Sequence, residues 1–357
     1  MKTIRISTLV LKIFLFFGSV NSFGQDFTLS QFQSNAHVFN PACIGSSGRD
    51  LRMLVAYRNQ WFASGFPYQT FLVSGEMKIN PFPKKLRQAA VSLVLADDQI
   101  GDGQWRNTWI SGGVSATKNL DAAHKHSLAF GISSALLIRQ FNAKNLLFEN
   151  QFESSSFSFN PEISAGENTT GLRQGFFQIN SGLFYQFEVS SRLSFGLGAS
   201  GLWLYRPNEA LSNIATASSL AKMNSRITSN FSAKMKLSTD FSIEPQCFFS
   251  QQGKAREFNF GGWFLFTSHL QNGGVWETGI GAFSRLNDSF IPAVRLGNGK
   301  LNAQLSYDAT FSNVKYNDIQ NKFIGIGGMG ALEFTIIYNL DFKSRAFKRF
   351  LVPCQTF

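Results

Sequence analysis

The stretch from Leu128 to Ile138 reads LAFGISSALLI. Large apolar side chains recur at every second position, at Leu128, Phe130, Ile132, Leu136 and Ile138, and most residues between them are small. A period of two places one set of side chains on each face of a β-strand, whereas a helix needs apolar residues three and four apart. One bulky apolar face and one face of small residues are typical of a wall between lipid and a lumen.

The same alternation over roughly ten residues recurs along the chain, as it does in outer-membrane β-barrels. It predicts an all-β fold, a closed antiparallel transmembrane barrel of about 14 strands. The expected strands are 51–58, 68–77, 89–97, 108–118, 126–140, 176–187, 193–205, 226–237, 241–250, 256–267, 275–285, 290–296, 300–309 and 331–342.

Charged residues in these segments keep to one face. In 226–237, Ile227, Phe231 and Met235 alternate with a face that carries Lys234 and Lys236. In lipid each such charge would cost about 2–4 kcal/mol at mid-depth. We therefore expect the charged face to line a wet lumen.

The N-terminus has the pattern of a secretory signal peptide. Lys2, Arg5 and Lys12 accompany a short apolar run, and small residues follow around position 22. The run is shorter than the ~20 residues that a membrane anchor needs. Cleavage after residue 24 would reduce the net charge from +11 to +8. In an exported, aromatic-rich chain this charge indicates anionic lipid headgroups or an acidic partner, and no nucleic acid.

The predicted strands and the segments before and after them divide the chain into four parts. Residues 1–24 are the expected signal peptide, and 25–50 a periplasmic cap or lumen plug. Residues 51–342 form the barrel, and 343–357 a basic periplasmic tail. With a periplasmic N-terminus, the long connections 142–175, 206–225 and 310–330 lie outside the cell, as is usual for such barrels.

None of the sequence motifs that suggest catalysis, a cofactor or a metal has the context that such a site requires. His124 and His126 form an H-x-H without further ligands nearby, and Asp97, Asp98 and Asp102 lack the spacing of a calcium loop. Residues 325–330 match G-x-G-x-x-G, but a strand pattern and no helix follows. We expect no enzyme, no cofactor and no metal site.

The three cysteines are too few for a disulfide scaffold. Cys247 shares the parity of Phe241, Ile243 and Phe249 and is expected to face lipid. Cys43 and Cys354 lie outside the predicted wall. They could pair in an oxidising compartment, although sequence does not determine connectivity.

Several motifs resemble the PorP/SprF family of Bacteroidetes outer-membrane proteins. They are Asn40-Pro41-Ala42 with the following Gly45-Ser46, then Tyr57-Arg58-Asn59-Gln60-Trp61, Pro67-Tyr68-Gln69-Thr70-Phe71, and Val352-Pro353-Cys354 with Phe357 near the end. They bracket nearly the whole mature chain. His37 and Cys43 replace expected aromatic residues, and the chain ends without a second proline.

The resemblance implies a 14-stranded barrel of the type IX secretion and gliding machinery, which assists secretion or surface anchoring of a large adhesin. It implies that the outer loops hold the exported partner. The N-terminal segment and tail would meet the periplasmic lipoprotein ring or peptidoglycan-associated proteins. The expected partner-binding residues are Asn40, Pro41, Ala42, Arg345, Lys348, Arg349, Pro353, Cys354 and Phe357.

A second function stays open at this point. The 39 Phe residues, the N-terminal segment as a hatch and the lumen lysines also suit an outer-membrane transport channel. Its solute would be hydrophobic or small and polar, as in a fatty-acid channel. A surface enzyme is a third and more distant alternative.

Overall fold

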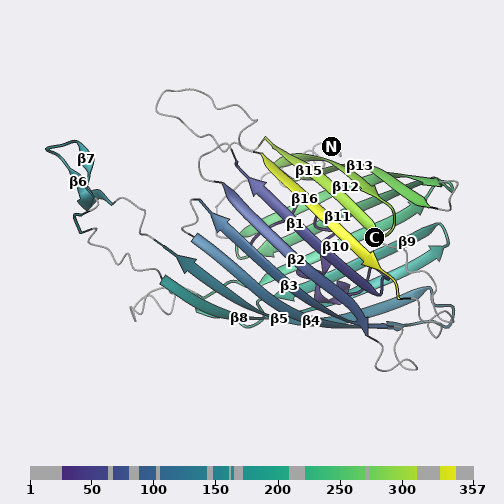
Figure 1. The fold of residues 1–357 in the computed structure, drawn as a ribbon. Coiled ribbons are helices and arrows are strands. Elements are labelled where there is room, and N and C mark those ends of the chain that lie inside the picture. Colours follow the sequence, from purple (N-terminus) through teal and green to yellow (C-terminus); the bar gives the residue numbers. More distant parts are fainter. Residues whose placement is uncertain are drawn as a thin grey trace, which may run out of the picture.

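A computed structural model describes residues 26–62, 67–79, 88–101, 105–142, 148–160, 162–164, 172–208, 222–269, 274–311 and 330–342. Within these ranges fourteen strands close into one antiparallel barrel, in which chain neighbours pair and β1 pairs with β16 (Figure 1). The strands are β1 (Leu51–Gln60), β2 (Tyr68–Ile79), β3 (Gln88–Ile100), β4 (Trp105–Asn119), β5 (His126–Phe141), β8 (Leu172–Ser190), β9 (Leu193–Leu202), β10 (Arg226–Lys236), β11 (Phe241–Gln252), β12 (Ala255–His269), β13 (Val275–Arg285), β14 (Ser289–Gly297), β15 (Leu301–Thr310) and β16 (Ala331–Leu340).

The predicted fold class is confirmed, and each predicted strand corresponds to one strand of the wall. Most strands extend a few residues beyond the alternating pattern, because pairing continues where the side chains no longer alternate. β14, whose sequence contains Pro292, pairs on both sides, with β13 and with β15. Among the described residues, no helix is long and apolar enough to span a membrane.

The two faces of the wall differ as the central stretch predicts. On β5, Phe130 is 53% exposed on the outer face, whereas its neighbour Ala129 is 4% exposed toward the lumen. β16 repeats the pattern, with Leu332, Phe334, Ile336 and Tyr338 outside and Glu333 and Thr335 fully buried inside. The apolar outer face is suited to hydrocarbon, whereas the inner face carries buried polar and charged side chains together with apolar ones.

The ends of the barrel differ in the length of their connections. At the turn end, residues 191–192, 237–240 and 298–300 join strands directly. At the loop end, the chain makes the long connections 142–171, 203–225 and 311–330. Part of the first forms a small hairpin that the alternation did not predict, η2 (Glu149–Gln151), β6 (Phe152–Glu153) and β7 (Ser158–Phe159).

Replacing Ile132, at the middle of the outer face of β5, with Arg is expected to lower the free energy of unfolding by about 2–4 kcal/mol. The charge would lie deep in hydrocarbon. Urea unfolding in lipid vesicles measures the change. The control is Leu120→Arg just beyond β4, an exposed apolar position at the bilayer boundary, where the cost is about 0–1 kcal/mol. Equal losses for both variants would contradict a lipid-facing β5.

Candidate functional site: a lumen filled by the N-terminal segment

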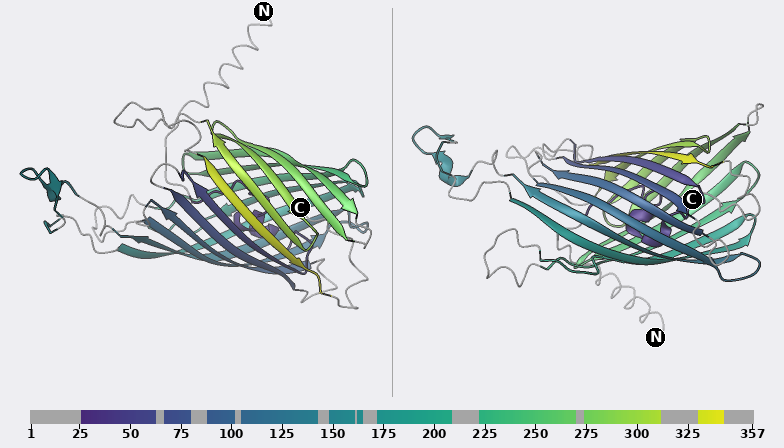
Figure 2. Two further views of the ribbon diagram at one scale, coloured as in Figure 1. Left: turned by 45° about the horizontal axis from the view of Figure 1, so that its top comes forward. Right: turned by 60° about the horizontal axis from the view of Figure 1, so that its bottom comes forward.

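Residues 26–50, called the plug below, lie inside the barrel and touch many strands of its wall. They include the helix α2 (Ala36–Phe39) and the 3₁₀ turn η1 (Pro41–Cys43). The purple segment is seen within the cylinder in both views of Figure 2. Leu29, Phe32 and Phe39 are at most 3% exposed, although the chain around them has little regular structure. The wall buries them.

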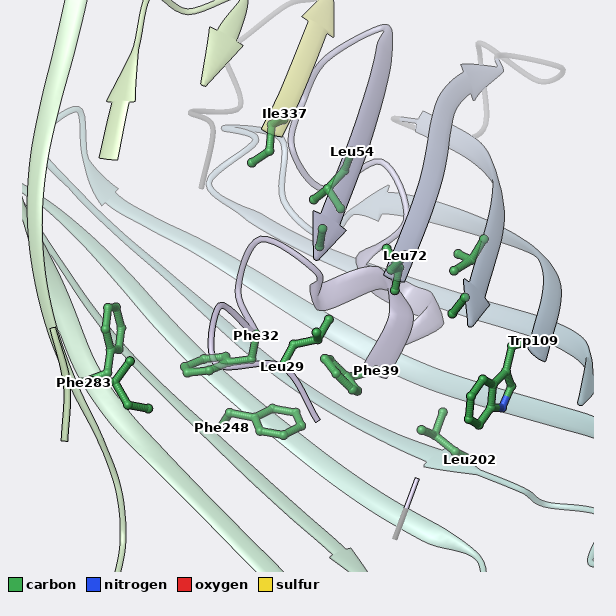
Figure 3. Packing of buried hydrophobic residues seen from close by; sticks show 14 of the residues in the cluster. Leu29, Phe32, Phe39, Leu54, Leu72, Trp109, Leu202, Phe248, Phe283 and Ile337 are labelled. Carbon is green, nitrogen blue, oxygen red and sulfur yellow. The ribbon is translucent and has the colours of Figure 1, made fainter. Parts of the chain in front are cut away.

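Aromatic contacts form the apolar part of this packing (Figure 3). The ring of Phe32 lies 5.4 Å from that of Phe248 and 6.2 Å from that of Phe283. Phe39 also contacts Phe248, with ring centroids 5.2 Å apart. Each such pair contributes roughly 0.5–1.5 kcal/mol beyond its buried area. Phe248 therefore joins both halves of the plug to β11.

An ionic cluster of the wall, called the Arg58 cluster, binds the start of the plug. Arg58 lies 2.8 Å from Asp308 and 3.2 Å from Glu333, and all three side chains are at most 2% exposed. The backbone N–H groups of Ser30 and Gln31 donate to the two oxygens of Glu333, at 2.6 and 3.0 Å. The wall charges are thus satisfied partly by plug backbone, so that removing the plug would leave buried carboxylate oxygens without donors.

A second ionic cluster, called the Glu76 cluster, binds the middle of the plug. Arg52 donates to Oε1 of Glu76 at 2.6 Å, and Nδ1 of His37 lies 3.3 Å from the same oxygen. The other oxygen of Glu76 accepts the backbone N–H of Gly45 at 2.8 Å. Arg52 also donates to the Ser34 carbonyl. Two wall residues therefore hold three separate parts of the plug.

Burial controls the protonation of two plug residues. Burial lowers the pKa of His37 from 6.5, against the opposing effect of the Glu76 carboxylate. Burial raises the pKa of the Cys43 thiol. His37 is therefore neutral in the docked plug, and Cys43 is an unreactive thiol as long as the plug stays in place.

The Asn40-Pro41-Ala42 turn sits on glycines of the inner wall. Oδ1 of Asn40 accepts the N–H of Ala42 at 3.0 Å and caps η1. Nδ2 of Asn40 donates to the carbonyl of Leu183 in β8 at 3.1 Å. A Cβ atom on Gly131 would lie 2.2 Å from the Pro41 carbonyl oxygen, and one on Gly182 would lie 2.1 Å from Oδ1 of Asn40. The small inner residues of β5 and β8 therefore leave the space that this turn occupies.

Hydroxyl groups of the wall complete the contacts of this turn. Ser200 and Thr228 both donate to the carbonyl oxygen of Phe39, at 2.6 and 3.0 Å. Ser115 donates to the carbonyl of Ile44 at 2.6 Å. The backbone hydrogen bonds within the plug end on other carbonyls, so those of Phe39 and Ile44 are satisfied by these wall hydroxyls.

The sequence-predicted partner residues fall in two places. Asn40, Pro41 and Ala42 are buried against the barrel's own wall, so their described contacts are intramolecular. Their role toward another protein stays a prediction. The tail residues Arg345, Lys348, Arg349, Pro353, Cys354 and Phe357 lie outside the described residues. Residues 1–24, the predicted signal peptide, also lie outside the described residues.

The structure describes two of the three cysteines, Cys43 and Cys247. Cys43 is buried in the plug, with Sγ 4.0 Å from Nδ2 of Asn230 on β10. Its suggested pairing with Cys354 lies outside the described residues. Cys247 is partly exposed on the outer face of β11, with the parity of Phe241 and Phe249.

The wet lumen expected around Lys234 is instead a packed, ion-paired interior. Lys234 lies 3.0 Å from Glu244, which is fully buried and also lies 3.5 Å from Arg295. Arg295 pairs in turn with Glu277 at 2.8 Å. Beside these residues, toward the turn end, a polar cavity of about 170 Å³ remains between plug and wall. It is lined by Gln33, Arg49, Arg52, Gln246, Trp263, Asn302 and Asn339 among others.

Other polar candidates are placed apart from one another. Asp97 lies on the outer face of β3 and binds Arg106, whereas Asp98 points inward and accepts from Thr70. His124 contacts Asn119, and His126 contacts Tyr185. In the part of the chain that the structure describes, no three His, Cys, Asp or Glu residues gather as metal ligands would.

The residues that hold the plug were not singled out from sequence. Arg58, Glu76 and Glu333 each occupy an inward position of a strand whose outer positions are apolar. The only indication of these residues in the sequence was a charged side chain at an inward position of a strand. It could not reveal a plug, because the plug partners of these three residues lie between 28 and 303 residues away in the chain.

Adding a methyl group at Gly182 is expected to displace the plug. In a Cys247→Ser, Cys354→Ser background, Gly182→Ala should raise the rate at which a maleimide labels Cys43 about tenfold or more, which corresponds to ~1.4 kcal/mol of docking free energy. Gly75→Ala is the matched control, because its Cβ would meet no atom within 4 Å. Labelling of the Gly182 variant at the control rate would show that the contact is dispensable.

Plug docking is expected to weaken in acid. The undocked His37 has the ordinary pKa of 6.5 and the docked one a lower pKa, so the undocked state binds more protons. Docking is therefore complete above pH 6.5 and weakens as the pH falls below it toward the docked pKa. Labelling of Cys43 at each pH, relative to the same protein in urea, measures this. His37→Gln should flatten the profile, and an unchanged acid response would assign it to another group.

Several solved structures are similar to this chain. The chain is similar to a Pseudomonas aeruginosa FadL homologue, with 10% identity and a TM-score of 0.48 over 85% of this chain and 94% of that one. It is also similar to the Ralstonia pickettii toluene transporter TbuX, with 9% identity and a TM-score of 0.45 over 86% of this chain and 93% of that one. The CymD monoaromatic hydrocarbon channel is similar as well, with 9% identity and a TM-score of 0.45 over 90% of this chain and 96% of that one. These similarities concern the barrel alone. No curated protein matched.

The family comparison is more specific. Residues 21–324 match the family described as type IX secretion system membrane protein PorP/SprF. The match covers the plug and thirteen of the fourteen strands, from β1 to β15. Together with the closed antiparallel wall and its apolar outer face, it places the protein in the bacterial outer membrane. The chain belongs to the PorP/SprF family of type IX secretion system membrane proteins.

Proposed function

We propose that this protein is a sealed, non-enzymatic barrel that assists secretion or surface anchoring of a large adhesin. The observation that carries the proposal is the fit of residues 26–50 to the inner wall. Two buried ionic clusters, a set of aromatic contacts and a seat of glycines all serve to hold this segment. In an open pore these inward groups would be hydrated, whereas here residues of the segment are their partners.

The ionic contacts give a reason for a plug that stays in place. A buried acceptor that loses its hydrogen-bond donor costs about 1–3 kcal/mol, and more when the acceptor is charged. Leaving the lumen would remove plug donors from Glu333 and Glu76 together. The barrel then acts as a rigid support, and its loop end is the surface that meets an exported partner.

The periplasmic side is the second contact surface in this proposal. Residues 343–357 follow β16 at the turn end and carry Lys343, Arg345, Lys348 and Arg349 without an acidic residue. Such a tail suits an acidic surface on the periplasmic lipoprotein ring or on a peptidoglycan-associated protein. Family membership supports partners within the secretion machinery.

The alternative is a transport channel for a hydrophobic or small polar solute, in which the plug would move. The observation that favours it is the polar cavity beside the plug at the turn end. The two functions differ in whether an open path through the lumen ever forms.

Two measurements on the same strains separate these functions. In planar bilayers, the purified barrel should show no steady conductance, whereas a variant that lacks residues 26–48 should conduct. In cells, deletion of the gene should leave small-solute uptake unchanged and abolish surface display of at least one large protein, identified by surface biotinylation. Steady conductance of the intact barrel with normal display in the deletion strain would establish the channel and refute the anchor.

A further inference from the structure

The loop between β5 and β8 carries a hairpin with its own hydrogen bonds. Its described residues are 148–160 and 162–164, and Figure 1 draws it apart from the barrel wall. The buried side chain of Gln151 accepts from the N–H of Phe148 at 3.0 Å and donates to the carbonyl of Ile163 at 3.0 Å. The backbone carbonyl of Gln151 accepts the N–H of Asn160 at 2.8 Å. One polar residue thus ties the hairpin together.

Three aromatic side chains form the tip of this hairpin. Phe152 pairs across the strands with Phe159, with ring centroids 5.2 Å apart, and contacts Phe157 edge-on at 6.2 Å. Phe157 is 84% exposed, the highest value among the exposed large apolar residues of the described chain. Burying such a ring is favourable through the hydrophobic effect, so its exposure leaves that free energy for a partner.

The backbone at the tip is unfavourable for phenylalanine. Phe157 has φ +49°, a conformation that Gly and Asn adopt readily and bulky residues rarely do. Strain of this kind destabilises the backbone and is typical of ligand-binding positions. A turn under no requirement but folding would carry Asn or Gly here. The ring of Phe157 therefore has a use outside the hairpin.

The charge of the hairpin narrows the choice of partner. Glu149, Glu153 and Glu162 are exposed, and residues 148–164 contain no Lys, Arg or His. The whole chain has a net charge of +11, so the hairpin is acidic on a basic protein. Anionic lipid headgroups would be repelled by these carboxylates. A protein surface with an apolar recess and flanking Lys or Arg residues complements both the rings and the charges.

We propose that residues 148–164 are the docking tip for the exported protein, which binds it through an apolar recess rimmed by basic residues. This inference rests on the proposed function and narrows its outer contact to one hairpin. Phe157 is the central anchor, with Phe152 and Phe159 beside it, and the glutamates orient the partner.

The sharpest variant is Phe157→Asn, which removes the ring and relieves the backbone strain, so the hairpin keeps its fold. A second variant, Phe152→Ser with Phe157→Asn and Phe159→Ser, removes the whole aromatic tip. A third reverses the charges by Glu149→Lys, Glu153→Lys and Glu162→Lys. Leu120→Asn is the matched control, an exposed apolar residue at the turn end of the barrel.

The readout is surface display of the proteins that surface biotinylation loses when the gene is deleted. Phe157→Asn and the charge reversal should each lower their display about tenfold, as loss of a hot-spot contact does, and the triple variant should match the deletion. Leu120→Asn should display normally. Normal display in all three hairpin variants, beside a deletion that abolishes it, overturns this inference and leaves the proposed function intact. Normal display in the deletion strain overturns the proposed function itself.

A lipid-binding role for the hairpin is tested separately. Ser155→Cys in the Cys247→Ser, Cys354→Ser background takes an environment-sensitive dye, while the buried Cys43 stays unlabelled. The dye spectrum is compared in detergent and in proteoliposomes of phosphatidylethanolamine, phosphatidylglycerol and lipopolysaccharide. An unchanged spectrum agrees with a protein partner, whereas a blue shift in liposomes alone assigns the hairpin to the membrane and overturns the proposal.

Discussion

Hydrocarbon offers no hydrogen-bond partner to a peptide group, and the architecture of this protein depends on that constraint. An open sheet edge in the bilayer would leave N–H and C=O groups unpaired at several kcal/mol each, so β1 must meet β16. Closure with fourteen strands makes a cylinder wider than the eight-stranded barrels whose interior side chains alone can fill. The lumen must therefore hold either water or another part of the chain. Here residues 26–50 occupy it.

The presence of the plug in the lumen changes the role of the charged side chains on the inner face. In an open pore Arg58, Glu76 and Glu333 would be hydrated and would act on passing solutes. Buried against the plug, they need full sets of partners, and backbone N–H groups of Ser30, Gln31 and Gly45 supply part of them. In this protein these wall residues bind the plug. The inner face accordingly combines charged, polar and apolar side chains that are buried between wall and plug.

A barrel filled in this way presents two surfaces for function, its loop end and its turn end. Family membership assigns the protein to the membrane proteins of the type IX secretion system. In the function proposed above, the acidic β6–β7 hairpin and the basic residues 343–357 are the surfaces that meet partners, and the plug keeps the lumen closed.

The sequence by itself determined the wall. Alternation such as that from Leu128 to Ile138 is a local property, because lipid acts on each outward side chain independently, and it predicted all fourteen strands. The motifs around Asn40 and Tyr57 likewise indicated the family. Only the tertiary structure decided what the inner face is for. Gly131 faces Pro41, Arg58 faces Ser30, and Glu76 faces Gly45. These contacts depend on how a closed cylinder folds around an irregular segment, and no periodicity in the chain encodes which inward residue that segment will meet.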